Sequence, residues 1–132
     1  IPPRDLRSWQ NLPVSAIANF NPVTINDVSE AALKTVLEKH PYRHFPVIEN
    51  GELKGIAPRR EIETAVLEKR SLRLEPVQKC TPNESIRASQ RALIDSSTNT
   101  LAIIRSEDGK LLAFLTLHDL LRAQVSMSER QH

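Results

Sequence analysis

The sequence predicts an α+β fold made of two copies of one β-α-β-β-α unit, packed as a pseudo-two-fold pair through their sheets. The same order of apolar runs, turns and amphipathic helices occurs twice, with Phe45 matching Leu101 and Glu61 matching Asp119. This spacing of about 57 residues indicates an internal duplication. Half of a chain of 132 residues is too short to bury a sufficient core alone, so each copy is expected to need the other.

Each copy contains a predicted β-hairpin. The four strands are expected at residues 44–48, 53–57, 101–104 and 111–115. Asn50-Gly51 separates the first pair of strands and Asp108-Gly109 the second pair. Asn, Asp and Gly accept the positive φ that tight turns require, so both positions are typical of hairpin turns.

An amphipathic helix is predicted after each hairpin. The first has Pro58 near its first turn. Ile62, Ala65, Val66 and Lys69 follow the i, i+3, i+4, i+7 spacing of a helix and so indicate one narrow apolar stripe. The second begins at Thr116, and Thr116-x-x-Asp119 is a capping arrangement.

A helix is also predicted before each hairpin, from a capping pattern. Asp27 followed by Glu30 predicts a helix that starts near residues 26–27. In the second copy Thr81 is the expected N-cap, Pro82 the first helical residue and Glu84 the third.

The chain is expected to divide into four segments. These are a linker at residues 1–11, a first repeat at 12–70, a second repeat at 71–126 and a tail at 127–132. Because the chain begins with Ile1 and not with Met, we expect it to be a fragment of a larger protein.

Composition argues against several kinds of site. Three glycines do not form a Gly-rich phosphate loop, and Cys80, the single cysteine, cannot form an internal disulfide or a cysteine zinc site. The four histidines lack metal-binding spacing, and no nucleophile–base pair emerges. A net charge of +2 is too mild to predict nucleic-acid binding. We therefore expect no enzyme activity, no metal, no required cofactor and no nucleic-acid partner.

The repeated pattern resembles a tandem pair of cystathionine-β-synthase (CBS) domains, also called a Bateman module. The resemblance rests on Phe45-Pro46-Val47-Ile48, the Gly51 turn, Leu53-Lys54-Gly55-Ile56 and Thr116-x-x-Asp119. A narrower resemblance links residues 42–47 and 53–61 to the first CBS repeat of the CLC family of chloride channels and chloride/proton exchangers. Its most telling feature is Arg59-Arg60-Glu61, although Pro58 departs from the usual apolar residue.

The resemblance implies an adenine nucleotide (ATP, ADP or AMP) bound in the cleft between the repeats. A helix that begins at Thr116 can hold a phosphate through its N–H groups, and Asp119 can accept two ribose hydroxyls. Tyr42 would stack on adenine while the backbone of Arg43 and His44 reads its edge. The other implied contacts are Ala16, Pro46 and His118. Two alternatives stay open: Thr116-x-x-Asp119 also caps a helix without any ligand, and Tyr42 could simply cover the sheet edge.

The symmetry-related cleft is expected to be degenerate. Pro58 replaces the threonine and Glu61 replaces the aspartate, so a hydroxyl and an N–H donor are lost. The loop that ends at Thr100 has no aromatic residue, although Arg59 could still attract a phosphate. The sequence therefore predicts at most one good nucleotide site per chain.

The resemblance implies a regulatory module on the cytoplasmic face of the membrane, within a CLC-type integral membrane protein. Its partners would be an adenine nucleotide, the parent transmembrane domain and a second copy bound through CBS–CBS contacts. One alternative is a purely structural dimerisation pair that binds no ligand. Another is the regulatory pair of a different parent, either a metal-ion transporter or an enzyme like IMP dehydrogenase.

Overall fold

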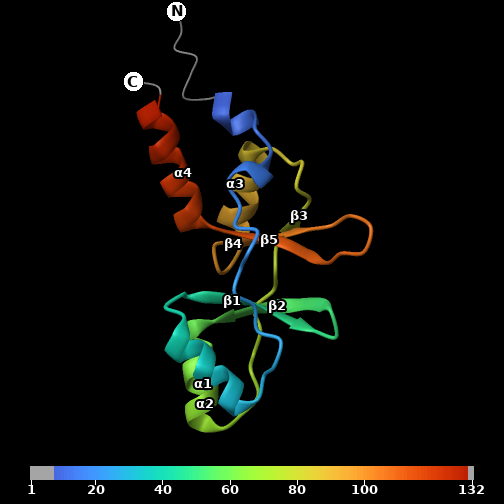
Figure 1. Ribbon diagram of the computed structural model, residues 1–132, viewed down its shortest axis with the longest axis vertical. Helices are drawn as coiled ribbons and strands as arrows, with labels where there is room; N and C mark the ends of the chain where they lie inside the picture. The colour runs from blue at the N-terminus through green and yellow to red at the C-terminus, as the bar shows by residue number, and fades with distance from the viewer. Residues whose placement is uncertain (1–7, 131–132) are drawn as a thin grey trace, which may run out of the picture. The chain divides into compact units, whose positions relative to one another are not determined.

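The computed structural model describes residues 8–130, which divide into two compact units (Figure 1). Unit 2 is the continuous segment Val23–Val77. Unit 1 joins the chain up to Pro22 with the chain from Gln78 onward. Each unit is described by itself.

Unit 2 is a two-stranded hairpin with two helices on one of its faces (Figure 1). Its elements are α1 (Glu30–Lys39), β1 (His44–Glu49), β2 (Glu52–Pro58) and α2 (Arg59–Glu68). Asn50 and Gly51 form the turn with φ of 54° and 77°, which explains why this dipeptide predicts the hairpin correctly. The short strand that the β-α-β-β-α unit places ahead of α1 is reduced to a parallel bridge between Ile25 and Val47. The core of the unit is formed by Ile25, Leu33, Phe45, Val47, Ala57 and Ile62.

Unit 1 contains a three-stranded sheet in the order β3-β4-β5, with α3 and α4 on the same side of it (Figure 1). Its elements are the 3₁₀ turns η1 (Ser8–Asn11) and η2 (Val14–Ala16), then β3 (Lys79–Cys80), α3 (Ile86–Asp95), β4 (Thr100–Ile104), β5 (Leu111–Thr116) and α4 (Leu117–Arg130). β3 runs parallel to β4, and β4 runs antiparallel to β5.

The N-terminal segment of the described chain packs with the second repeat. Trp9 and Val14 are 4% and 0% exposed and belong to the same core as Leu93 and Leu115. The Val14 N–H donates to Glu84 O at 2.7 Å. Residues 1–7 of the expected linker lie outside the described residues, whereas residues 8–11 form η1 and contribute Trp9 to a core.

The predicted starts of α1 and α3 were wrong by a few residues. α1 begins at Glu30, and the Oγ of its N-cap Ser29 accepts from Ala32 N–H. Asp27 instead accepts from Ser29 N–H at 2.9 Å in the preceding turn. α3 begins after the N-cap Ser85, whereas Thr81 N–H donates to Glu84 Oε2 at 2.9 Å in the turn ahead of the helix. Both errors arise because an acidic side chain can close a turn in the same way that it caps a helix.

Gly55 lies where another segment of unit 2 crosses β2. Ile56 and Glu75 exchange two backbone hydrogen bonds, at 3.0 Å and 2.8 Å, as an antiparallel bridge. A Cβ at Gly55 would lie 2.8 Å from Glu75 O and 3.0 Å from Leu74 Cβ. The missing side chain is therefore what lets residues 74–75 pair with the strand.

Candidate functional site

The predicted site residues fall into two sets, one in each unit. Unit 1 holds Ala16, Thr116, His118 and Asp119, together with Thr100 from the second predicted cleft. Unit 2 holds Tyr42, Arg43, His44 and Pro46, together with Arg59 and Glu61.

Thr116 and Asp119 form a reciprocal cap where β5 passes into α4. Thr116 N–H donates to Asp119 Oδ2 at 3.2 Å, and Asp119 N–H donates to Thr116 Oγ1 at 3.1 Å. Both residues are half-buried. The capping arrangement that the sequence predicts is therefore formed in the structure. It holds the carboxylate in one orientation, with Oδ1 unbonded within residues 8–130.

The start of α4 has few free backbone N–H groups that could bind a phosphate. Leu117 N–H donates to Asn99 O at 3.0 Å, and Asp119 N–H is taken by Thr116 Oγ1. Of the first three N–H groups, at most that of His118 is left for an anion, because the protein itself engages the other two. The predicted phosphate role of Thr116 is thus supported less well than the ribose role of Asp119. A carboxylate has acceptor sites for several donors, and the cap occupies one oxygen only.

The other two predicted contacts in unit 1 are exposed. Ala16 ends η2, and its N–H donates to Pro13 O at 3.0 Å. His118 lies on the first turn of α4, beside an open apolar groove that it lines with Leu121, Arg122, Val125 and Ser126.

In unit 2 the predicted adenine-binding residues follow the end of α1. The Tyr42 side chain is 54% exposed, and its ring stacks on His40 with centroids 6.1 Å apart and planes 11° apart. It also meets the buried Phe45 edge-on at 6.3 Å. An aromatic ring supported in this way presents a flat apolar face, as stacking on a nucleobase requires.

The neighbours of Tyr42 differ in how accessible they are. Arg43 is exposed, but its carbonyl accepts from Arg59 N–H at 2.7 Å. Burial and then the Arg43 charge lower the pKa of His44, which favours the neutral imidazole at pH 7. Pro46 is fully buried, and its carbonyl accepts from Ile25 N–H at 2.8 Å, so its visible role is in the core.

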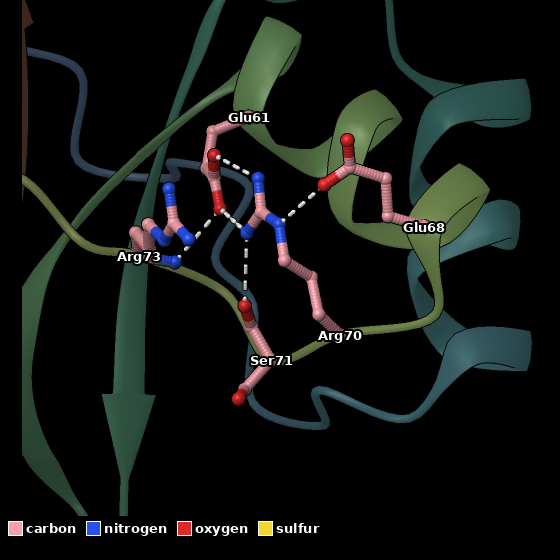
Figure 2. A network of polar contacts seen from close by, with 5 residues as sticks. All are labelled: Glu61, Glu68, Arg70, Ser71 and Arg73. Atoms are coloured by element: carbon pink, nitrogen blue, oxygen red, sulfur yellow. Dashed lines mark hydrogen bonds and ion pairs between the residues drawn. The ribbon is translucent and has the colours of Figure 1, made fainter.

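Glu61, the counterpart of Asp119, is already saturated by protein donors (Figure 2). Arg70 Nη1 and Nη2 donate to its two oxygens at 2.7 Å and 3.0 Å, and Arg73 N–H donates at 2.8 Å. The bonds from Arg70 and then Arg73 lower the pKa of Glu61 to about 2. Both oxygens of Glu61 are thus engaged, unlike those of Asp119. Pro58, the N-cap of α2, adds no hydroxyl to this helix start.

Arg59 and Thr100, the other residues of the predicted second cleft, also have internal partners. The Arg59 guanidinium donates to three carbonyl oxygens of unit 2. Thr100 is 0% exposed, and its Oγ1 lies 2.6 Å from Thr98 Oγ1 in a chain of buried hydroxyls that includes Ser96. These partners favour the predicted degeneracy of the second cleft.

The roles of Arg70 and Arg73 were not predicted from the sequence. Lys69 ends α2 in the left-handed conformation, with φ of 54°, and so turns Arg70 back toward Glu61. A left-handed lysine has no clear signature, because glycine or asparagine is usual at a helix C-terminus. The one available signal was the density of arginines at residues 70 and 73.

Neither a metal cluster nor a reactive thiol is found in the part of the chain that the structure describes. No group of three or more His, Cys, Asp or Glu residues there could hold a metal ion. Cys80 is buried, and burial raises the pKa of its thiol to about 11. Over residues 8–130, none of the helices combines the length and the hydropathy needed to cross a membrane.

Comparison with protein families identifies the repeat. A model of the CBS domain matches residues 14–68 and again residues 70–126. The chain therefore belongs to the CBS domain family, as a tandem pair. A search of curated proteins gave no match.

Solved structures of CBS domains share the fold. The CBS domain of a putative transporter from Clostridium difficile 630 is 15% identical, with a TM-score of 0.77 over 90% of this chain and 98% of that chain. The CBS-pair protein CBSX2 from Arabidopsis thaliana is 18% identical, with a TM-score of 0.69 over 90% and 98%. The CBS domain of the bacterial CNNM/CorC family Mg²⁺ transporter, in complex with ATP, is 19% identical, with a TM-score of 0.74 over 89% of each chain. The α+β class and the CBS-pair fold are thereby confirmed.

Proposed function

We propose that this CBS pair is a regulatory, non-catalytic module that binds an adenine nucleotide, ATP, ADP or AMP. Asp119 accepts the ribose hydroxyls, Thr116 and the His118 N–H lie toward the phosphates, and Tyr42 stacks on the adenine. Arg43, His44, Pro46 and Ala16 are secondary contacts in this proposal. The observation that carries it is the contrast between two equivalent carboxylates. Asp119 keeps an unbonded oxygen within the described chain, whereas Glu61 is saturated by Arg70 and Arg73.

A similar fold with a bound nucleotide supports this assignment. The CBS domain of the CNNM/CorC family Mg²⁺ transporter has been solved in complex with ATP. That likeness is one of fold, so the residues named above are proposed from this chain's own sequence and are not carried over from that protein.

The parent is proposed to be a membrane transporter, with the module on its cytoplasmic face. The pattern over residues 42–47 and 53–61 favours a CLC-type chloride channel or exchanger. A metal-ion transporter is the second candidate, because CBS domains of the CNNM/CorC transporter share the fold. The coupling free energy between nucleotide binding and transport is expected to be about 1–3 kcal/mol, which is enough to tune the transport rate.

Replacing Asp119 with alanine is expected to raise the Kd for ATP by at least about tenfold, because the ribose hydroxyls lose a charged acceptor. Isothermal titration with ATP, ADP and AMP measures this change. Glu107→Ala is the matched control, since Glu107 is an exposed carboxylate in the same unit. Loss of the cap is expected to cost about 0.5–2 kcal/mol of stability, so a melting curve verifies that the variant is folded. Equal affinities of Asp119→Ala and the wild type would refute the assignment.

A structural CBS pair that binds nothing is the competing function. A nucleotide that binds the native state must raise the melting temperature in a concentration-dependent manner. We expect such a rise of Tm with at least one of ATP, ADP and AMP. A flat response to all three, with each at millimolar concentration, would favour the structural role.

A further inference from the structure

Arg59 opens α2, and its side chain reaches across to the end of α1. Its Nη2 donates to Leu37 O at 2.8 Å, and its Nη1 donates to His40 O at 2.6 Å and to Tyr42 O at 3.2 Å. Its backbone N–H donates to Arg43 O at 2.7 Å. One residue therefore holds four carbonyl groups within the segment 37–43.

The bonds from Arg59 take the place of the usual C-terminal cap of α1. The last carbonyls of an α-helix have no partners within the helix and carry partial negative charge, so a cation or a left-handed glycine usually satisfies them. The segment after α1 contains no glycine, and its C-cap His40 is extended, with φ of −130° and ψ of 122°. The planar, permanently charged guanidinium suits this place because its fork can bind several carbonyls at once.

We infer that Arg59 is a positioning residue for Tyr42, and that it acts on adenine binding through the loop at residues 40–43. This inference rests on the proposed function and adds a role to it. Tyr42 is more than half exposed, and its visible ring contacts are with His40 and Phe45. The backbone that carries it is fixed by Arg59 at Tyr42 O and on either side, at His40 O and Arg43 O. A stacking ring that is held before the ligand arrives loses less freedom on binding.

The sequence suggested that Arg59 could attract a phosphate. Its contacts with carbonyl oxygens favour the positioning role instead. Three acceptors already engage two of its nitrogens within unit 2. Arg60, the next residue, is exposed, so it serves as a matched control of equal charge.

A double-mutant cycle tests the inference by isothermal titration with ATP. Arg59→Lys keeps the charge but loses the fork, and we expect the Kd to rise about 5- to 20-fold. In a Tyr42→Ala background the same substitution is expected to change the Kd less than about twofold, since there is no ring left to position. Arg60→Lys is expected to leave the Kd unchanged. Should Arg59→Lys not be folded at the assay temperature, Arg59→Gln takes its place in the cycle.

The outcomes are distinct. A loss that depends on Tyr42 supports the positioning role, because a general loss of stability would reduce binding in both backgrounds. Equal losses in both backgrounds, or no loss in either, overturn it while the proposed function stands. If the wild type binds none of ATP, ADP and AMP, the proposed function fails and the role of Arg59 fails with it.

Discussion

Replacing Gly55 with valine is expected to lower the free energy of unfolding by about 2–6 kcal/mol. A Cβ at this position would lie 2.8 Å from Glu75 O and 3.0 Å from Leu74 Cβ, and the first of these is a backbone atom that cannot simply rotate away. Overpacking of this kind costs about 1–3 kcal/mol, and each hydrogen bond lost between Ile56 and Glu75 adds about 0.5–1.5 kcal/mol. Urea denaturation of the wild type and the variant measures the difference.

A second glycine in the same unit provides the control. Gly51 has a φ of +77° but open space around its position for a Cβ, so Gly51→Ala tests backbone strain without a clash. Strain of that kind costs about 1–2 kcal/mol. If Gly55→Val proved no more destabilising than Gly51→Ala, the close approach of residues 74–75 would not be what requires a glycine at position 55. Faster proteolysis near Arg73 in Gly55→Val would show that the crossing segment has been released.

Local signals in the sequence predicted the elements but not how they are combined. Asn50-Gly51 has the backbone that a two-residue hairpin needs, and the repeated order of elements revealed the duplication. The helix starts failed where Asp27 and Glu84 close turns that resemble caps. The packing of Trp9 with the second repeat depends on contacts far apart in the sequence, which no local pattern encodes.

In the candidate site, too, local patterns were predicted correctly and contacts between distant residues were not. Thr116-x-x-Asp119 predicted a cap, and the structure forms that cap with both bonds. Whether a carboxylate keeps a free oxygen, however, depends on donors that arrive from elsewhere in the chain. For Glu61 these donors come from residues 70 and 73, which follow Lys69. The left-handed conformation of Lys69 has no local signature from which it could be predicted.

Glu61→Gln is expected to destabilise the protein by about 1–3 kcal/mol at pH 7, because it removes the anion that the Arg70 fork and Arg73 N–H share (Figure 2). The Glu61 and Arg70 side chains are 17% and 22% exposed, so solvent screens the pair only in part. The neighbouring Glu63 is exposed on the same helix, and Glu63→Gln is expected to cost less than about 0.5 kcal/mol. Urea denaturation at pH 7 compares the three proteins.

The effect of acid follows from the same bonds and separates the charge of Glu61 from its shape. Its pKa is lowered from 4.5 to about 2 in the folded chain, so its contribution is fully present above about pH 4.5 and is lost as the pH falls toward 2. The stability difference between the wild type and Glu61→Gln is therefore expected to be constant from pH 7 to about pH 5 and to shrink between pH 4.5 and 2. Glu63→Gln is expected to follow the wild type throughout. If the difference persisted unchanged at pH 2, Glu61 would stabilise the fold through packing of its side chain, and not through its charge and the bonds from Arg70 and Arg73.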